Sequence, residues 1–449
     1  MKTDSPHILC INPWIHDFAA FDFWAKPLGL LSIAAILREK GLRVSFIDCL
    51  DRFHPKESKE IKVFWDGRGP FRKTRIDLPK ELENSKELEN SGKKFSRYGI
   101  KPQWFEADLK QVKRPDLIFV TSLMTYWATG VKETIEIVKA VYPDVPVILG
   151  GIYASLCHEH AKKDTLADLV IKGPGENHLK KIIKEFTGFE LEENNLSGDL
   201  DELPFPALDL QTKMVYAPIL TSRGCPFSCE YCASSYLEPK LRQRSPENVF
   251  KEIKLWHQTH GIKNFAFYDD ALLVNARQYA FPLFEKIIAS KMELFFHTPN
   301  ALHIKAITQE AAELMFKAGF KTIRLGLETT DFSNSRNHDV KVTRNEFYTA
   351  VENLKAAGFE KKQIGAYLLC GLPGQNLDEV ENSMELVRQT GIQPVLAYYS
   401  PIPHTPMWET AKEHSKFNLL EHPVFTNNTL FPCVNSDIDL KRISRLKNS

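Results

Sequence analysis

The stretch TSRGCPFSCEYCASS, residues 221–235, decides the architecture of the second half of the chain. It places Cys225, Cys229 and Cys232 within one short segment of a 449-residue chain that has eight cysteines in all. The interspersed glycine, proline and serine residues favour a loop over a helix. A loop can bring three sulfurs onto one metal centre, and soft thiolates suit an iron–sulfur cluster or zinc.

The number of clustered cysteines helps to separate these two kinds of site. A structural zinc site normally has four ligands, and no CxxC or HxxxH partner is evident for the cluster. The other five cysteines are scattered singly, and of these Cys370, at the end of an expected strand, is a minor candidate for a fourth ligand. Three thiolates on a four-iron cluster would leave one iron open to bind a small molecule, so an iron–sulfur cluster is the favoured interpretation.

The segments around this loop predict a barrel. Six strand-plus-helix units follow residue 211, and helical patterns such as SPENVFKEIKLWHQTHG have a Ser-Pro start and a Gly stop. The expected strands lie near residues 217–221, 264–268, 293–297, 322–326, 363–369 and 395–399. Six such repeats predict a partial (β/α)6 TIM-like barrel over residues 211–408, with its site at the carboxyl ends of the strands.

The amino-terminal part predicts a different α/β domain. Apolar strands such as HILCIN, DLIFVTS and VPVILGG alternate with amphipathic helices, which predicts a Rossmann-like parallel sheet covered on both faces. We assign residues 1–197 to this domain, with a charged, irregular excursion at 54–114. Residues 198–210, rich in Pro and Asp, are the expected linker, and residues 409–449 form an irregular carboxyl-terminal segment.

Composition narrows the possible partners. The chain is 43% hydrophobic and 26% charged, with a formal net charge of +1, so nucleic acid is not favoured as a partner. The first residues lack the basic head and apolar run of a secretory signal. The apolar stretch at 27–37 is short and followed by REKG, which suits a core helix better than a membrane span. We expect a cytoplasmic protein, in which thiols stay reduced.

The run SRGCPFSCEYC resembles the C-x3-C-x-aromatic-C signature of the radical S-adenosylmethionine (SAM) superfamily, with Tyr231 as the aromatic residue. The resemblance implies that Cys225, Cys229 and Cys232 hold a 4Fe-4S cluster whose open iron chelates the amino and carboxylate groups of SAM. Reductive cleavage of SAM would then yield a 5′-deoxyadenosyl radical that abstracts hydrogen from a substrate.

Other strand ends extend this resemblance. GLETT, with Glu328, resembles the G-x-E-S segment near the SAM methionyl group, although Thr329 replaces Ser. CGLPGQ, with Gly371 and Pro373, resembles the apolar turn near the adenine. The alternative for Glu328 is a solvated loop carboxylate. For Gly371 and Pro373 it is a simple turn.

Polar residues also end the second and third barrel strands. They are Asp269, Asp270, His297 and Asn300. Each could contact the cofactor ribose, the substrate or an acid–base relay, and we include Asn300 among the cofactor-binding candidates. Each could equally cap the next helix or satisfy loop backbone groups.

The amino-terminal domain is similar to the cobalamin-binding type that precedes the barrel in one branch of this superfamily. The similarity rests on INPW, VTSLMTYWATG, VILGG and IKGPGE, and implies that Ser122, Thr125, Gly150 and Gly151 contact cobalamin. Taken singly, the glycines are better explained as tight turns after strands. The D-x-H-x-x-G motif is absent and His16 receives no cobalt role, so the domain could also serve only as a scaffold.

Three functions follow in order of preference. The first is a radical SAM enzyme that uses cobalamin to methylate an unactivated carbon of an unknown small-molecule or peptide substrate, with an external one-electron reductant. The second keeps the radical chemistry without cobalamin and catalyses ring formation or rearrangement. The third, an iron–sulfur electron-transfer or sensing module, is disfavoured because such clusters usually have four cysteine ligands.

Overall fold

A computed structural model describes residues 5–58, 61–83, 85–192, 198–332 and 342–447. The chain divides into two units. The first unit comprises Met1–Met214 and Leu419–Thr426, and the second comprises Val215–Asn418 and Asn427–Ser449.

The first unit is built on a sheet of five parallel strands. In spatial order they are β3 (Arg43–Asp48), β1 (His7–Asn12), β6 (Leu117–Val120), β7 (Val147–Leu149) and β8 (Leu169–Val170). All residues of β1 and β6 are buried, as their continuous apolar runs predict for a sheet covered on both faces. The strand order reverses direction between β1 and β6, and ligands of open α/β sheets bind at such a point, outside the carboxyl ends of the strands.

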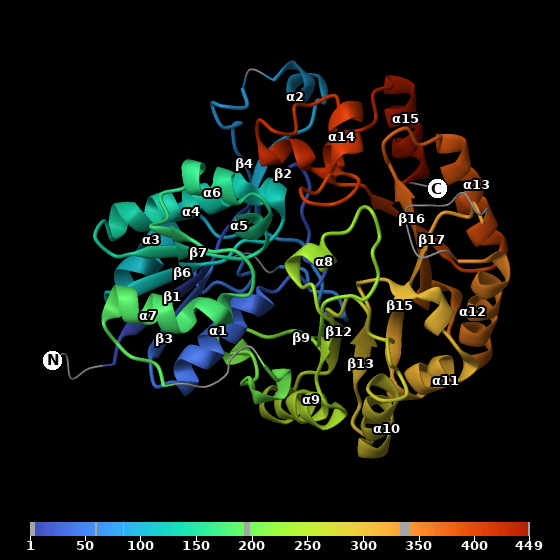
Figure 1. Cartoon of the computed structure of the whole chain (residues 1–449), viewed down its shortest axis with the longest axis horizontal. Helices are drawn as coiled ribbons and strands as arrows, with labels where there is room; N and C mark the ends of the chain where they lie inside the picture. Colours follow the sequence, from blue (N-terminus) through green and yellow to red (C-terminus); the bar gives the residue numbers. More distant parts are fainter. Residues whose placement is uncertain (1–4, 59–60, 84, 193–197, 333–341, 448–449) are drawn as a thin grey trace. The chain divides into compact units, whose positions relative to one another are not determined.

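Helices cover both faces of this sheet (Figure 1). Leu9 and Ile11 of β1 pack in one core cluster with residues of α3 (Pro102–Gln111) and α4 (Ala128–Val141). Ile8 and Cys10 point to the other face and pack with residues of α1 (Leu28–Glu39) and α7 (Leu179–Thr187). This alternation along β1 follows the two-residue period of a strand.

Residues 54–114 contain both a small sheet and a core helix. The strands β4 (Lys73–Arg75) and β5 (Ser96–Tyr98) join β2 (Ile15–Asp17) in an antiparallel sheet in the order β2-β5-β4. A short helix, α2 (Lys86–Asn90), precedes β5, and its Ser85 hydroxyl accepts from the Leu88 N–H. The helix α3 closes the segment, with Phe105 and Leu109 fully buried in the main core.

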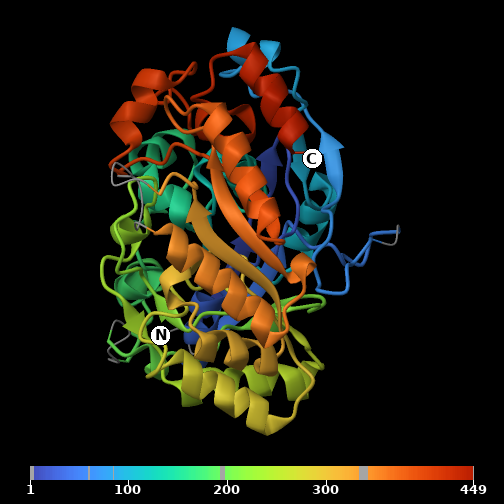
Figure 2. The same ribbon diagram turned by 90° about the vertical axis from the view of Figure 1, so that its right-hand side faces the viewer.

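The second unit is a row of six parallel strands in sequence order. They are β9 (Ala217–Ile219), β12 (Asn264–Phe267), β13 (Phe295–His297), β15 (Phe320–Glu328), β16 (Ile364–Cys370) and β17 (Gln393–Tyr398). Five helices between them lie along the outer side of the row (Figures 1 and 2). These are α9 (Pro246–His260), α10 (Ala280–Ser290), α11 (Gln309–Ala318), α12 (Arg344–Ala357) and α13 (Leu377–Gln389). The order confirms the expected partial (β/α)6 architecture.

Local sequence signals start and stop these helices. The Ser245 hydroxyl accepts from the Asn248 N–H at the start of α9, and Gly261 ends that helix in the left-handed conformation, as the Ser-Pro and Gly signals predict. Thr343 and Glu346 form a capping box at the start of α12. Phe267, Phe296 and Phe320 stack against one another inside the sheet, with ring centroids 5.4–5.6 Å apart.

The carboxyl-terminal segment is divided between the units. The helices α14 (Trp408–His414) and α15 (Asp437–Leu446) belong to the second unit, where Arg442 forms ion pairs with Asp378 and Glu381 of α13. The 3-10 helix η7 (Pro423–Thr426) belongs to the first unit. None of the helices in the described ranges is both long and apolar enough to span a membrane.

Candidate functional site

The three clustered cysteines follow the first barrel strand, β9, and lie in the loop between the short strand β10 (Ser222–Arg223) and α8 (Ser234–Leu237). None of Cys225, Cys229 and Cys232 forms a disulfide, and each is partly exposed. Gly224 has a φ of +83°, and a Cβ there would lie 2.7 Å from the Lys240 carbonyl oxygen. The turn that begins the cysteine loop therefore requires glycine.

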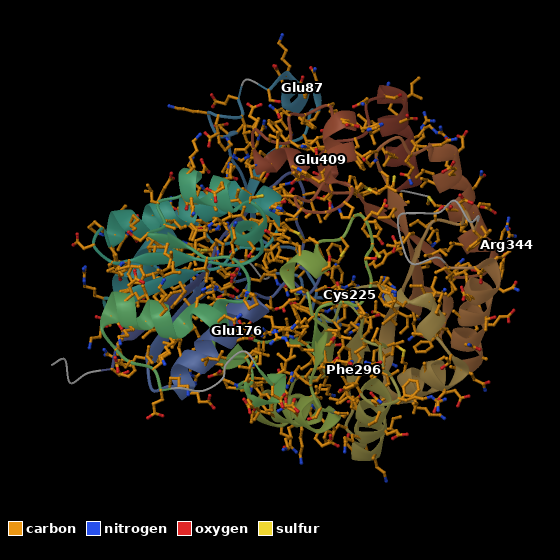
Figure 3. The ribbon with its side chains drawn as sticks, in the orientation of Figure 1. Glu87, Glu176, Cys225, Phe296, Arg344 and Glu409 are labelled. Carbon is orange, nitrogen blue, oxygen red and sulfur yellow. The ribbon has the colours of Figure 1, made fainter. Side chains whose placement is uncertain are left out.

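The Cys225 thiol is partly buried near other ionisable groups of the loop. Burial raises the pKa of the Cys225 thiol to about 11, and Asp270, Cys232 and Cys229 act in the same direction, while a hydrogen bond from the Phe227 backbone opposes them. A bound cationic centre would favour the thiolate instead, since metal binding lowers a thiol pKa. In Figure 3, Cys225 lies beyond the end of the strands, whereas Phe296 lies within the sheet.

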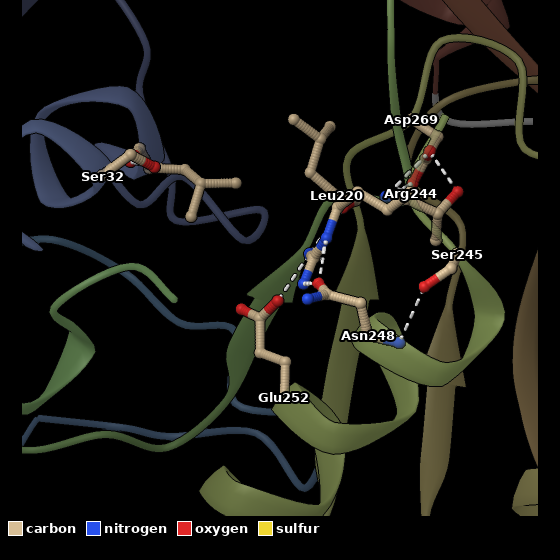
Figure 4. Close-up of polar contacts among 9 residues, drawn as sticks. Ser32, Leu220, Arg244, Ser245, Asn248, Glu252 and Asp269 are labelled. Carbon is tan, nitrogen blue, oxygen red and sulfur yellow. Dashed lines mark hydrogen bonds and ion pairs between the residues drawn. The ribbon is translucent and has the colours of Figure 1, made fainter. Parts of the chain in front are cut away.

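The start of the loop is anchored by Asp269, which follows β12. Its buried carboxylate accepts from the Thr221 backbone N–H at 3.0 and 3.1 Å, from the Thr221 hydroxyl at 2.6 Å and from the Ser222 hydroxyl at 2.7 Å (Figure 4). Burial raises the pKa of this carboxyl, and these hydrogen bonds oppose the rise. Asp269 thus fixes the two residues that lead from β9 into the cysteine loop.

A second anchor was missed from the sequence. The Arg244 guanidinium donates to the Leu220 carbonyl at 2.9 Å and pairs with the Glu252 carboxylate at 2.6 Å (Figure 4). Glu252 is fully buried on α9, between the core residues Val249 and Ile253. The available signal was the position of Glu252 on the apolar stripe of α9, where a charged residue needs a buried partner.

The ends of β13 and β15 carry the candidate SAM contacts. Glu328 has a φ of +64°, an uncommon conformation for a residue with a side chain. A Cβ at Gly326 would lie 3.3 Å from the Glu328 Oε1 atom, so the missing side chain makes room for this carboxylate. Asn300 donates to the Tyr268 carbonyl at 2.9 Å and to the Asp269 carbonyl at 3.2 Å. The Asn300 amide therefore joins the loops after β12 and β13.

The turn after β16 is stabilised by the side chain of Gln375, a residue of the turn itself. The Gln375 Oε1 accepts from the Gly371 N–H at 2.8 Å, and its Nε2 donates to the Leu369 carbonyl at 2.9 Å. Gly371 has a φ of +89°, and Pro373 is partly exposed in the turn. Cys370, at the end of β16, is buried, and burial raises the pKa of its thiol to about 12.

Three other candidates have different surroundings. His297 is buried, with its ring nitrogens 2.9 Å from the Thr322 hydroxyl and 3.1 Å from the Asn264 amide oxygen, so both nitrogens are engaged within the sheet. Asp270 is exposed and acts electrostatically on Cys225. Tyr231 is partly exposed within the cysteine loop.

In the first unit, Ser122, Gly150 and Gly151 meet at the carboxyl ends of β6 and β7. The Ser122 hydroxyl donates to the Gly150 carbonyl at 2.7 Å and accepts from the Ala154 N–H at 3.2 Å. Gly151 has a φ of +98°, and a Cβ there would lie 2.2 Å from the Ser122 carbonyl oxygen. Thr125, on the following 3-10 helix η1 (Thr125–Trp127), shares a 3.0 Å hydrogen bond with Thr426.

Comparison with known families assigns both units. The family model described as Radical SAM superfamily matches residues 219–387, and the model described as B12 binding domain matches residues 99–183. The chain is a radical SAM enzyme with a B12-binding domain. The radical SAM match includes the cysteine loop and the ends of β12, β13, β15 and β16, and the B12-binding match includes Ser122, Thr125, Gly150 and Gly151.

Curated relatives and solved structures agree with this assignment. An uncharacterized methyltransferase of Pyrococcus horikoshii is 25% identical over 327 residues, covering 66% of this chain and 69% of that protein. Cytidylyl-2-hydroxyethylphosphonate methyltransferase of Streptomyces wedmorensis is 22% identical, covering 86% and 77%. The radical SAM methyltransferase TsrM from Kitasatospora setae superimposes with a TM-score of 0.65 at 15% identity, covering 91% and 76%, and therefore shares the fold.

The donor set of the radical SAM domain fits an iron–sulfur cluster. Three partly exposed cysteines in one loop offer the soft ligands that such a cluster needs. The buried Asp269 and the partly buried Arg244 fix the start of that loop without using any of the sulfurs.

The edge of the B12-binding domain also fits a broad, flat cofactor. Backbone and small side chains form the strand ends, and a Cβ at Gly173, in the loop after β8, would meet open space. The bulky Trp127 packs within the unit, where its Nε1 donates to Asp17 at 2.6 Å. His16 lies 2.9 Å from the Glu133 carboxylate.

Proposed function

We propose that this chain is a cobalamin-dependent radical SAM methyltransferase that modifies an unactivated carbon of a small-molecule or peptide substrate. The observation that supports the proposal most strongly is the presence of three cysteines, none of them in a disulfide, in one loop at a barrel strand end, in a chain that also has a B12-binding domain. The division of labour follows from this: the cofactors supply the difficult chemistry, and the protein supplies orientation and exclusion of water.

In the radical SAM domain, Cys225, Cys229 and Cys232 would hold the cluster. When bound, the cluster and SAM supply a 5′-deoxyadenosyl radical for hydrogen abstraction. The Glu328 carboxylate, placed over Gly326, is suited to accept hydrogen bonds from a cationic amino group, and such charge-assisted bonds are about twice as strong as neutral ones. Asn300 and the Gly371–Gln375 turn would line the same strand ends.

In the B12-binding domain, Ser122, Thr125, Gly150 and Gly151 would form the cradle for cobalamin. When bound, cobalamin supplies the methyl group for transfer. The glycines bring backbone rather than side chains to the surface of the cradle, and the hydroxyls of Ser122 and Thr125 are already oriented by hydrogen bonds. We further propose an external one-electron reductant and a reducing, cytoplasmic setting, because the clustered cysteines must stay available as thiolates.

Anaerobic reconstitution tests this function. The purified chain, supplied with iron, sulfide, cobalamin and a chemical reductant, should convert SAM to 5′-deoxyadenosine and bind cobalt as cobalamin. A Cys229→Ser variant should lose the 5′-deoxyadenosine, whereas Cys433→Ser, outside the loop, should keep it. Absence of 5′-deoxyadenosine from the reconstituted chain would refute the radical function, and its presence without cobalamin binding would refute only the methyl transfer.

Ring formation is the second candidate, because some relatives have that activity. The anaerobic magnesium-protoporphyrin IX monomethyl ester cyclase of Cereibacter sphaeroides is 22% identical over 348 residues, covering 68% of this chain and 56% of that protein. Product analysis separates the two candidates. Methyl transfer forms S-adenosylhomocysteine from SAM, whereas ring formation by hydrogen abstraction does not.

A further inference from the structure

Three potential metal ligands meet in the first unit, away from the cysteine loop in the sequence. His160 and Asp164 lie on the helix α6 (His158–Asp164), where their i,i+4 spacing places them on one face. His422 immediately precedes η7, in the carboxyl-terminal segment that belongs to this unit. One ligand atom from each of the three side chains lies within 4.8 Å of the others.

Two polar atoms of these side chains are buried and find no hydrogen-bond partner among the residues that the structure describes. One is the Nε2 atom of His422, a residue that is 4% exposed. The other is the Oδ2 atom of Asp164, whose side chain is 19% exposed. Leaving buried polar atoms unsatisfied is costly, and a native structure usually explains each case by a water, an ion or a functional role.

The groups around these three side chains favour the binding of a cation. The His160 Nδ1 lies 2.7 Å from the Tyr153 hydroxyl, a partner of the kind that orients a metal-bound histidine and leaves its Nε2 lone pair free. Lys132 pairs with the other Asp164 oxygen at 3.0 Å and with Glu81 at 3.1 Å. With both imidazoles neutral, the two carboxylates and one ammonium leave a net charge of −1.

We propose that His160, Asp164 and His422 bind a divalent transition-metal ion of the zinc or ferrous class. Two imidazoles and one carboxylate are a common ligand set for these metals, and three protein ligands leave further positions for water. Burial lowers the pKa of His422 to about 4 and also lowers that of His160, so the neutral, metal-binding forms predominate near pH 7.

One hydrogen bond of His422 is lost when a metal binds, and this loss weakens metal binding. The His422 Nδ1 accepts a hydrogen bond from the Val424 backbone N–H at 3.1 Å. A neutral His422 that binds metal through Nε2 must carry its proton on Nδ1, so this hydrogen bond is lost. A neutral hydrogen bond of this kind corresponds to roughly a fivefold change in affinity. A fivefold loss is small compared with the affinity of a structural zinc site. Losing this hydrogen bond therefore does not prevent binding.

The bound ion would fasten the carboxyl-terminal segment to the first unit. His422 comes from Leu419–Thr426, and His160 and Asp164 come from α6, so one ion joins residues that are more than 250 positions apart. The Thr125–Thr426 hydrogen bond already attaches the same segment to η1. An ion that binds only to the folded chain would stabilise this attachment by mass action.

Cobalt(II) binding to the full chain tests the proposal. A Cys225→Ser/Cys229→Ser/Cys232→Ser background removes the competing thiolate site, and apo protein in this background is titrated with Co²⁺ in the absence of cobalamin. We expect visible d–d absorption without sulfur-to-cobalt charge transfer, saturating at a single ion. Adding His422→Gln or Asp164→Asn should weaken binding at least about tenfold, whereas His158→Gln, at the start of the same helix, should leave it unchanged.

Zn²⁺-dependent stability provides an independent readout. Zn²⁺ should raise the unfolding midpoint of the triple Cys→Ser background, and this rise should disappear when His422→Gln or Asp164→Asn is added. The unfolding midpoints of these variants in the presence of a chelator report whether they fold. The proposal is overturned if the background binds no Co²⁺, or if folded His422→Gln and Asp164→Asn proteins bind Co²⁺ as tightly as the background.

Discussion

Asp269 shows how a single buried carboxylate can fix the start of the cysteine loop. Its oxygens accept from the Thr221 amide and from the hydroxyls of Thr221 and Ser222, the residues just ahead of the cysteines. The sequence indicates a polar residue at this strand end, because Asp269 follows a buried strand. It does not indicate the partners of the carboxylate, because they depend on how β9 and β12 pair.

Asp269→Asn should weaken this anchor. The amide keeps the shape of the side chain but loses the charge and replaces one acceptor with a donor, so we expect the second unit to lose about 1–3 kcal/mol of stability. Iron retained after anaerobic reconstitution should fall as well. Chemical unfolding and iron analysis measure the two effects. Asp270→Asn, at the exposed neighbouring position, is the control for stability, and equal losses in both variants would argue against the anchor.

Glu328→Gln should weaken SAM binding. Removing the charge while keeping the shape would raise the Kd of the reconstituted protein for SAM about tenfold, equivalent to about 1.4 kcal/mol. Equilibrium dialysis with labelled SAM measures this change. Thr329→Ser, at the next position, should bind SAM like the parent. An unchanged Kd for Glu328→Gln would remove Glu328 from the SAM site.

At the scale of elements, local signals predict most helices and strands, while their ends depend on neighbours in space. β1 was expected at residues 7–12 and is observed there, because its apolar run is short and bounded. β15 was expected at 322–326 but extends over Phe320–Glu328, since β14 (Leu302–His303) and β16 pair with its carboxyl end. Pairing between distant strands is not encoded in local periodicity.

The Arg244–Glu252 pair connects α9 to the strand that feeds the cysteine loop. Removing one partner leaves an uncompensated buried charge, so Arg244→Met should destabilise the second unit by about 3–5 kcal/mol. Arg244→Met/Glu252→Leu, which removes both charges, should recover much of that loss. Urea unfolding of the two single variants and the double variant forms a double-mutant cycle. Strictly additive losses would mean that the two side chains do not act as a pair.

At the scale of the whole molecule, two recognisable domains account for the radical SAM and B12-binding functions, and the segment after residue 409 is the part that sequence patterns did not explain. It was expected to be irregular, yet residues Asp437–Leu446 form the helix α15, and Leu419–Thr426 packs as part of the first unit. Thr125 and Thr426 are adjacent only because of that return. A contact of this kind depends on the path of the chain, so composition and periodicity cannot reveal it.

The central claim is that three sulfurs hold a four-iron cluster and leave one iron for SAM. Mössbauer spectroscopy of ⁵⁷Fe-reconstituted protein, recorded with and without SAM, tests it most directly. We predict a four-iron cluster in which one iron alone changes its isomer shift and quadrupole splitting when SAM is added. A spectrum that SAM leaves unaltered, with all four irons coordinated by protein sulfur, would contradict the account.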